Sequence, residues 1–493
     1  MTGTIPFKIR QIIHGRELLL WAVALFLLLS AAYAFSVDIR ASRGAFITGD
    51  EPFYLLTTQS LLADGDLDLR NQYKAKSYRS FFDHAGDLWH QSAPTADGRL
   101  LSPHNPGLSV LMIPGYALAG LRGVQVQLLL MAAAAMTFAF ILADRLTGRR
   151  AVCWLVALGV GLTATAFIYS TEIYPEFPAA LALIAGLLIA VHSERPGWRG
   201  ALFLVITLTA LCWLGAKYVA LALPVSAYFL LRADWSGRMA LAGLGSLSAA
   251  LFIWFHLHVF GGLTPYGVNV VYSQWNTAQI LAGHVEFSER YYRIWGLFVD
   301  RRFGIGHWAP LLLAAVPALA LLVMNIWEHR LVLVLIVIQL LIATFVAITM
   351  MGWWFPGRTM LTVLPLFIVP LALLIDRSSM ALRVVMALLG VCTLAFTAGL
   401  AHAGKVGEIT IAVDPFDMTF VPFQAVAGLF PLYTRWTAET WQLTYAWWAA
   451  FVFAIAAVLW PEISGVGQQL SQKFRDSFGK RNPGLPPDEI PGP

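Results

Sequence analysis

Long apolar runs separated by short polar segments recur along the whole chain. Many runs hold about twenty residues, enough for a helix to cross a hydrocarbon layer about 30 Å thick. The first run, 18–37, is too long for the apolar region of a signal peptide and lacks a small-residue cleavage site, so we expect a retained helix. The pattern predicts an all-α polytopic membrane protein.

The apolar runs give about twelve predicted transmembrane helices with both termini on the cytoplasmic side. The predicted spans are 18–37, 124–143, 151–170, 177–192, 200–216, 218–231, 239–260, 309–326, 331–351, 359–375, 380–401 and 441–460. Because 218–231 is short and contains Pro224, the stretch 200–231 could instead be a broken pair with Lys217 at its outer elbow. The short apolar stretch 108–121 contains Pro114 and is placed as an interfacial or re-entrant helix.

Composition and charge agree with a membrane location. Hydrophobic residues make up 58% of the chain and charged ones 12%, with a mean hydropathy of +0.68, whereas a soluble domain carries about 25% charged residues. The net charge of +5 is scattered through short loops, which gives no basic face for nucleic acid. All three cysteines lie within apolar runs and are expected to be buried thiols.

Lysine and arginine favour short cytoplasmic loops, and this preference sets the predicted orientation. It places 1–17 and the tail 461–493, predicted to be mostly disordered, in the cytoplasm around a membrane domain at 18–460. The extracytoplasmic loops are then 38–107, 261–308 and 402–440, with short turns at 171–176 and 352–358. The first loop is expected to contain short amphipathic helices and a small β-hairpin that turns at Ala96-Asp97-Gly98-Arg99.

An acidic pair, Asp50-Glu51, directly precedes Pro52 and an amphipathic stretch in the first outer loop. Proline favours the first turn of a helix, so we expect Glu51 to be the N-cap and Asp50 to precede it. The amides of a helix start also attract phosphate oxygens. The pair is therefore either a simple cap or the place where a base and an anionic headgroup meet.

Further charged and aromatic residues fall in the outer segments. The acids Glu172 and Glu176 flank Tyr174, and carboxylates at that depth usually have a function. Arg358 follows Trp353 and Trp354 in a turn that we expect to be exposed; it is either a snorkelling residue of the aromatic belt or a phosphate clamp.

Other cations and histidines are weaker candidates. Lys217, Arg301 and Arg302 are possible phosphate ligands. His84, His90 and His104 match no metal-binding spacing, so loop packing is favoured, with His104 kept as a possible phosphate ligand. The sequence requires no metal ion or other cofactor; a divalent ion, if present, would take Asp50, Glu172 and Glu176 as ligands.

Several motifs resemble segments of bacterial GT-C superfamily glycosyltransferases, which are related to protein O-mannosyltransferases and to the transferase that adds aminoarabinose to lipid A. They are Gly49-Asp50-Glu51-Pro52-Phe53-Tyr54-Leu55, the run 61–69, His104-Asn105-Pro106-Gly107, Tyr174-Pro175-Glu176, Asp300-Arg301-Arg302-Phe303-Gly304 and the arginine turn before Leu364-Pro365. The likeness covers most of the membrane region. One departure is Phe355-Pro356-Gly357-Arg358, where glycine is expected before proline.

The resemblance implies an inverting glycosyltransferase of the bacterial cytoplasmic (inner) membrane, transferring a hexose or pentose on the extracytoplasmic side. The donor would be a polyprenyl-phosphate-linked sugar, and the acceptor a hydroxyl of a glycan, lipid or protein. The resemblance also implies that Asp50 is the catalytic base, with Glu51 beside it. From the residues themselves, we expect Arg358 to be the main phosphate ligand, with Lys217 or Arg301 in reserve. Tyr54, Trp353, Trp354, Glu172 and Glu176 are substrate or metal candidates.

Two other functions use the same outer charges. A transporter or flippase for an anionic lipid or solute would bind and release cargo there, although such proteins usually carry repeats or midplane charges. An O-antigen ligase or polymerase would share the lipid-linked donor, but it normally has a larger arginine-rich outer loop than 261–308.

Overall fold

The computed structural model describes residues 7–479 except 272, 275, 285, 286, 348, 349 and 351–353. The α-helices in the N-terminal half are α1 (Phe7–Ala34), α2 (Glu51–Ala63), α3 (Arg70–Lys74), α4 (Gly107–Leu111), α5 (Ile113–Thr147), α6 (Arg150–Gly161), α7 (Ala164–Tyr169), α8 (Glu176–His192), α9 (Trp198–Leu214), α10 (Val219–Arg232) and α11 (Trp235–Phe260). Those that follow are α12 (Thr277–His284), α13 (Arg293–Val299), α14 (Ile305–Trp308), α15 (Ala315–Ala318), α16 (Ala320–Val323), α17 (Trp327–Leu341), α18 (Ile368–Arg377), α19 (Met380–Lys405), α20 (Val421–Ala427) and α21 (Ala438–Gly479).

Short helical turns connect these helices. They are η1 (Ser77–Ser80), η2 (Ala216–Tyr218), η3 (Pro265–Val268), η4 (Pro310–Ala314), the π-helical η5 (Ile342–Val346), η6 (Arg358–Met360), η7 (Leu364–Phe367) and η8 (Pro415–Asp417). Ser92 and Asn269 form an isolated antiparallel bridge. No strand is assigned in the described residues, so the all-α prediction is confirmed.

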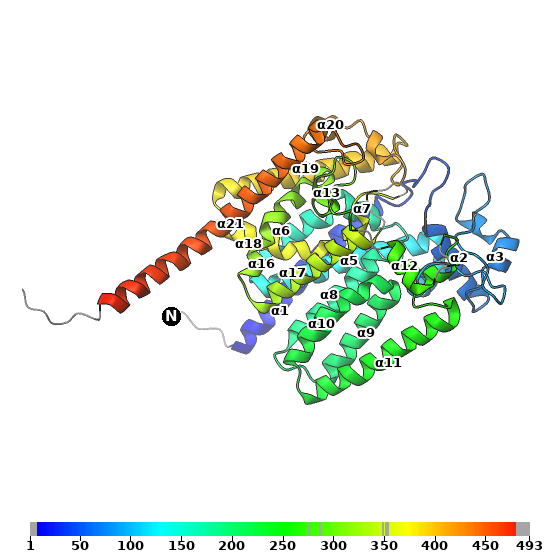
Figure 1. Ribbon diagram of the computed structural model, residues 1–493, viewed down its shortest axis with the longest axis horizontal. Coiled ribbons are helices and arrows are strands. Elements are labelled where there is room, and N and C mark those ends of the chain that lie inside the picture. Colours follow the sequence, from blue (N-terminus) through cyan, green and yellow to red (C-terminus); the bar gives the residue numbers. More distant parts are fainter. Residues whose placement is uncertain are drawn as a thin grey trace, which may run out of the picture.

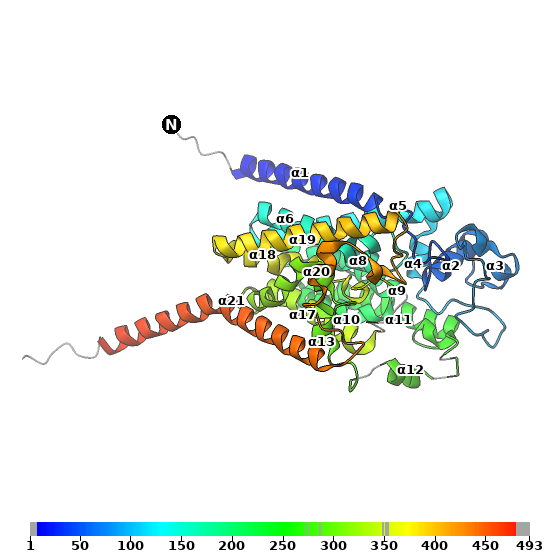
Figure 2. The same ribbon diagram turned by 90° about the horizontal axis from the view of Figure 1, so that it is seen from above.

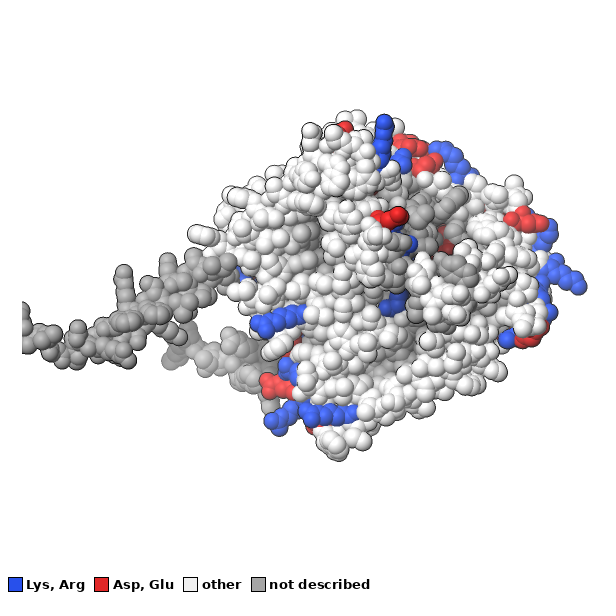
Figure 3. All heavy atoms as spheres, in the orientation of Figure 1, with Lys and Arg blue, Asp and Glu red and all other residues white. Residues whose placement is uncertain are grey.

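The helices form a bundle with its loop-rich end around α2, α3 and α12 (Figure 1). Helices α1 and α21 run along opposite flanks (Figure 2). Only 6% of the α21 window and 11% of the α11 window is buried, so their apolar side chains face outward, as expected against lipid. On the face shown in Figure 3, charged side chains gather toward the ends of the bundle and are sparse between them.

Six helical segments in the described residues are long and apolar enough to cross a membrane: Gly15–Ala34, Ile113–Thr147, Trp235–Val268, Trp327–Val346, Met380–Lys405 and Ala438–Trp460. The other predicted spans correspond to shorter helices, so the predicted count of about twelve is not established. The predicted span 151–170 is divided, because Thr163 caps α7 by accepting a hydrogen bond from the Ala166 amide.

Both ambiguous stretches contain breaks. Residues Ala119 and Gly120 are non-helical within α5, and the chain folds back so closely that a Cβ on Gly123 would lie 2.0 Å from the Gly115 carbonyl oxygen. The stretch 108–121 is therefore distinct from the span that follows it. Helices α9 and α10 are separated by η2, with Lys217 at the elbow as the broken-pair alternative predicted.

Several arginine-containing turns were predicted to be cytoplasmic. In the structure, two ion pairs and a hydrogen bond hold these turns together at one end of the bundle. Arg149 pairs with Asp376 at 2.8 Å, and Arg150 pairs with Glu17 at 3.3 Å. Arg145 donates to the carbonyl of His192 at the end of α8. These contacts agree with placing the turns on a common side; which side faces the cytoplasm remains a prediction.

Two local expectations differ from the structure. The turn at Asp97-Gly98 forms, with Gly98 at φ +81°, and the Thr95 amide donates to the Arg99 carbonyl; however, no strands flank it in the described residues. The tail predicted to be disordered is helical as far as Gly479, because α21 continues beyond the apolar run, and 480–493 lie outside the described residues.

Candidate active site

Asp50 and Glu51 lie at the start of α2, but their positions differ from the prediction. Asp50 is the N-cap and Glu51 is the first helical residue, with Pro52 after it. Within the described part of the chain, no side-chain hydrogen bond caps α2, so the expected capping role of Glu51 is wrong. The two adjacent carboxylates instead face different partners, which separates their functions.

The carboxylate of Asp50 is 25% exposed and has partners at both oxygens. Its Oδ2 lies 3.3 Å from Arg358 Nη1, while Oδ1 accepts a hydrogen bond from Gln91 Nε2 and lies 3.7 Å from His104 Nε2. Burial alone would raise the pKa of Asp50, but the charges of His104 and Arg358 and the Gln91 hydrogen bond hold it below its usual value. Asp50 is therefore an ionised carboxylate that solvent can reach.

Arg358 bridges two carboxylates. Besides Asp50, it contacts Glu176, whose Oε1 lies 3.2 Å from Arg358 Nε. The guanidinium carbon lies 3.7 Å from the centre of the Tyr174 ring and 5.3 Å from that of Trp354. Arg358 is only 12% exposed, so the expectation of an exposed turn residue is wrong: the guanidinium is drawn inward by the buried acid.

The arginine turn is held in place from α7. Tyr169 and Thr165 donate hydrogen bonds to the carbonyls of Phe355 and Pro356. Gly357 has φ +88°, and a Cβ there would lie 2.7 Å from Ile305 and 2.8 Å from Thr165. A glycine is thus required directly before Arg358. The altered order of proline and glycine does not prevent Arg358 from reaching Asp50.

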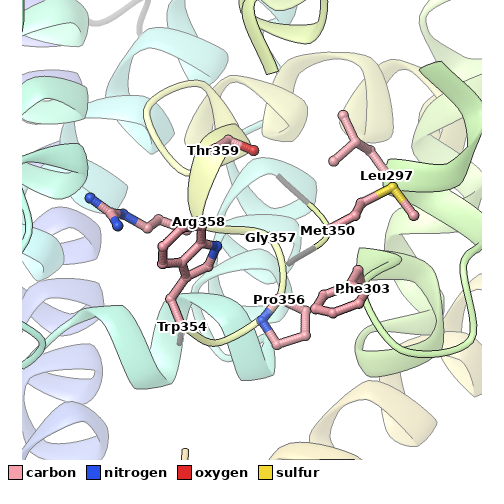
Figure 4. A pocket seen from close by; sticks show the side chains of 8 residues that line it. All are labelled: Leu297, Phe303, Met350, Trp354, Pro356, Gly357, Arg358 and Thr359. Atoms are coloured by element: carbon pink, nitrogen blue, oxygen red, sulfur yellow. The ribbon is translucent and has the colours of Figure 1, made fainter. Parts of the chain in front are cut away.

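A small cavity of about 10 Å³ adjoins this turn, enough for about one water molecule. Its lining comprises Leu297, Phe303, Met350, Trp354, Pro356, Gly357, Arg358 and Thr359. Figure 4 shows the Arg358 side chain pointing away from Leu297 and Met350. The guanidinium therefore serves the carboxylate cluster rather than this cavity.

Lys217 is the second cation of the cluster. The elbow between α9 and α10 carries its Nζ to 3.4 Å from Glu176 Oε1, and the side chain is 31% exposed. The other oxygen of Glu176, Oε2, is buried and has no hydrogen-bond partner among the residues that the structure describes. Lys217 is thus more accessible than Arg358 and makes a single ion pair among the described residues.

Glu51 is 1% exposed and faces Glu172 rather than Asp50. Its oxygens accept hydrogen bonds from the amides of Thr48 at 2.9 Å and Ile173 at 3.0 Å. Burial raises the pKa of Glu51 to about 7 and that of Glu172 well above its usual value, and the two side chains share a hydrogen bond. Because Glu51 already accepts from backbone amides, we assign the shared proton to Glu172.

Two further candidates join the cluster through aromatic contacts. The rings of Tyr54 and His104 are stacked, with their centres 4.7 Å apart. His104 Nε2 also lies 2.7 Å from Gln91 Oε1. His104 therefore contacts the proposed base rather than standing apart as a phosphate ligand. Gln91 was not predicted, and no sequence pattern marked it, because it belongs to an irregular loop.

Arg301 and Arg302 have their described contacts elsewhere. Arg301 bonds the carbonyl of Phe430 and lies 3.5 Å from Glu439, while Arg302 lies over the Phe416 ring. Both therefore lie against the loop segments around α20 and the start of α21. Trp353 lies outside the described residues.

The described residues contain no group of three or more His, Cys, Asp or Glu side chains arranged to hold a metal ion. Glu176 has Arg358 and Lys217 as partners, and Glu172 has Glu51. The carboxylates proposed as metal ligands are thus divided between two sets of contacts.

No protein-family model matches the chain, and no curated protein matches it. Among solved structures, the chain is similar to ArnT from Cupriavidus metallidurans. The apo structure gives 15% identity and a TM-score of 0.47 over 89% of this chain and 76% of ArnT. The structure bound to undecaprenyl phosphate gives 14% identity and a TM-score of 0.49 over 92% and 80%. At this level of similarity, the ligand and activity of ArnT do not transfer to the present chain.

Proposed function

We propose that the protein is a membrane glycosyltransferase that moves a sugar from a polyprenyl-phosphate carrier to an acceptor hydroxyl at the extracytoplasmic face. The observation that carries the proposal is the arrangement of Asp50, an accessible ionised carboxylate, beside Arg358, Glu176 and Lys217. The motifs that resemble GT-C enzymes include Asp50, Glu176 and Arg358, and the fold brings these three distant segments together.

Sugar transfer from a phosphate-linked donor to a hydroxyl requires a base for the acceptor proton and fixed positive charge beside the phosphate. A phosphate leaves as a stable anion, so it needs cations rather than the protonated carboxyl group used by a glycosidase. In the proposed step, Asp50 takes the proton of the acceptor hydroxyl as its oxygen bonds to the anomeric carbon. The bond from that carbon to the phosphate oxygen breaks, and its electron pair leaves with the polyprenyl phosphate.

Inversion constrains the roles of the two cations. In an inverting reaction, the acceptor and the leaving phosphate lie on opposite faces of the sugar. A cation that forms an ion pair with the base is therefore poorly placed to contact the leaving phosphate oxygen. Arg358, at 3.3 Å from Asp50 and between two acids, fits the role of holding the base. Lys217, more exposed and paired only with Glu176 among the described residues, is the proposed phosphate ligand.

Other residues take supporting roles in this proposal. Tyr54, through its stacked contact with His104, and Trp354, beside Arg358, would border the sugar. Glu51 and Glu172 would fix the start of α2 against the turn between α7 and α8. Both Glu51 oxygens accept hydrogen bonds from backbone amides, and one of these amides, that of Ile173, belongs to that turn. Glu51 then positions Asp50 and does not contact substrate.

A transporter for an anionic lipid or solute is the second candidate. The break between α9 and α10, with Lys217 at the elbow, is the feature that favours it. The test supplies purified protein with labelled polyprenyl-phosphate sugars and a crude envelope acceptor. The proposal expects labelled product and release of polyprenyl phosphate. Donor binding without turnover, together with movement of donor across vesicles, would favour transport.

A further inference from the structure

A charged groove lies at the end of α9 and α10 opposite to the elbow that carries Lys217. Its volume is about 530 Å³, and it lies between the α8–α9 and α10–α11 connections. Its lining residues are Glu194, Arg195, Leu231, Arg232, Ala233, Asp234, Trp235 and Arg238. Helix α9 has 17 residues and is about 25 Å long, so the groove is remote from Asp50.

The two connections that form the groove are fixed to each other. The Asp234 amide donates to the Pro196 carbonyl at 3.2 Å, and the Trp198 amide donates to the Ser236 hydroxyl at 3.3 Å. A Cβ on Gly237 would lie 2.4 Å from the Pro196 oxygen, so only glycine permits this close approach. The groove is therefore built into the packing of the two turns.

The positive charges in the groove are incompletely paired. Arg195 and Arg238 are exposed and form no ion pair among the described residues. Arg232 pairs with Glu328 at 3.0 Å, yet no described residue accepts a hydrogen bond from its buried Nε.

The two acids of the lining, Glu194 and Asp234, do not cancel the positive charge of the arginines. Asp234 is occupied as a helix cap, accepting hydrogen bonds from Ser236 and the Gly237 amide. Arg232 is already paired with Glu328, so exposed Glu194 can offset only one of the two remaining arginines, Arg195 and Arg238.

Apolar side chains extend the groove along the outside of the bundle. Leu231 and Trp235 are 81% and 75% exposed, and exposed Met239, Leu247 and Leu251 follow Trp235 at intervals of four or eight residues along α11. Residues four apart are neighbours on a helix surface, so these side chains form a stripe that is inclined to the axis of α11 and leads away from the arginines. Tryptophan also favours the headgroup level of a bilayer.

We propose that this groove binds an anionic phospholipid, with the headgroup phosphate between Arg195 and Arg238 and an acyl chain along the α11 stripe. A soluble phosphate would use the arginines but would gain nothing from Leu231, Trp235 and the stripe. A zwitterionic lipid would gain less from Arg195 and Arg238, which form no ion pair with any described residue. The site does not depend on the proposed transferase activity.

The test is native mass spectrometry of the full chain in detergent, titrated separately with phosphatidylglycerol and phosphatidylcholine. The native protein should retain phosphatidylglycerol more tightly, and R195A/R238A should weaken that binding roughly thirty-fold. The control R16A/R43A removes two exposed arginines outside the groove and should bind like the native protein. D50N should also bind normally, which separates this result from the fate of the proposed function.

The apolar part of the site has its own test. L231S/W235S should lose phosphatidylglycerol while keeping its thermal unfolding temperature, because both side chains are exposed. Excess inorganic phosphate should not displace the lipid. Unchanged lipid binding by R195A/R238A would overturn the proposal. Full displacement by phosphate, with no effect of L231S/W235S, would overturn it in favour of a soluble-anion site.

Discussion

Arg358 Nη1 lies 3.3 Å from Asp50 Oδ2, although 308 residues separate the two side chains in the sequence. The same guanidinium contacts buried Glu176, so Arg358, at the start of η6, links the start of α2 to the start of α8. This contact makes Arg358 a structural centre of the site.

Replacing Arg358 by alanine should destabilise the fold. The change removes the arginine partner of Asp50 and leaves Glu176 with Lys217 as its cation, and removing one member of a buried pair costs about 3 kcal/mol. Thermal unfolding in detergent should show a lowered midpoint. R302A is the control, since Arg302 lies over the Phe416 ring away from the cluster. Equal unfolding midpoints for the two variants would contradict a central role for Arg358.

The Glu51–Glu172 pair should make stability depend on pH. Burial raises the pKa of Glu51 to about 7 and the pKa of Glu172 well above its ordinary value. The folded state therefore keeps a proton that the unfolded chain loses. Stability should fall as pH rises above about 4.5 and should still be falling at pH 7, by up to about 1.4 kcal/mol per pH unit for one proton, because the proton on Glu172 is held to higher pH than in the unfolded chain. Unfolding midpoints measured from pH 5 to pH 8 check this.

Two amide substitutions distinguish the partners of that pair. E172Q can still donate a hydrogen bond to Glu51, so it should flatten the pH dependence and stabilise the protein at pH 8. E51Q should destabilise at every pH, because its amide group would face a backbone N–H from Thr48 or Ile173. E194Q, an exposed change, is the control. The opposite order of E172Q and E51Q would refute the proton assignment.

Gln91 and His104 should tune the base. Both help to hold the pKa of Asp50 below its usual value, so Q91A and H104A should raise that pKa. The acid limb of the pH profile of kcat/KM should then move to higher pH. H90A is the matched control, because His90 packs against Tyr73 rather than Asp50. An acid limb that stays in place in both variants would remove their proposed role.

Lys217 should govern use of the donor. K217A should lower kcat/KM for the polyprenyl-phosphate sugar roughly tenfold to a hundredfold, since a hydrogen bond to a charged group contributes about 1.5–3 kcal/mol. R301A should leave donor kinetics unchanged, because Arg301 contacts a different part of the protein from Asp50. It donates a hydrogen bond to the Phe430 carbonyl and lies 3.5 Å from Glu439. Initial rates over a range of donor concentrations measure both. A larger effect from R301A than from K217A would reverse the assignment.

The all-α membrane class could be predicted from the sequence, because runs of about twenty apolar residues match the thickness of the hydrocarbon layer. The elbow at Lys217 was also foreseen as an alternative, since Pro224 and a short apolar run marked it. The number of spans did not follow, because breaks such as Thr163 divide apolar runs without changing their hydropathy.

The site was predictable only in part. Asp50, Glu176 and Arg358 were identified by their motifs, yet their mutual contacts depend on packing between distant helices. The different partners of Asp50 and Glu51 could not be deduced, because adjacent residues at a helix start can face different segments. Gln91 was missed since its loop has neither periodicity nor a motif.

The most direct test of the account compares sugar transfer by purified D50N and native protein supplied with the same polyprenyl-phosphate sugar and acceptor. Asparagine keeps the shape of the side chain but cannot accept the acceptor proton as a carboxylate does. We predict a rate lowered by about 10²–10⁴-fold, with donor still bound. Transfer by D50N at the native rate would contradict the assignment of Asp50 as the catalytic base.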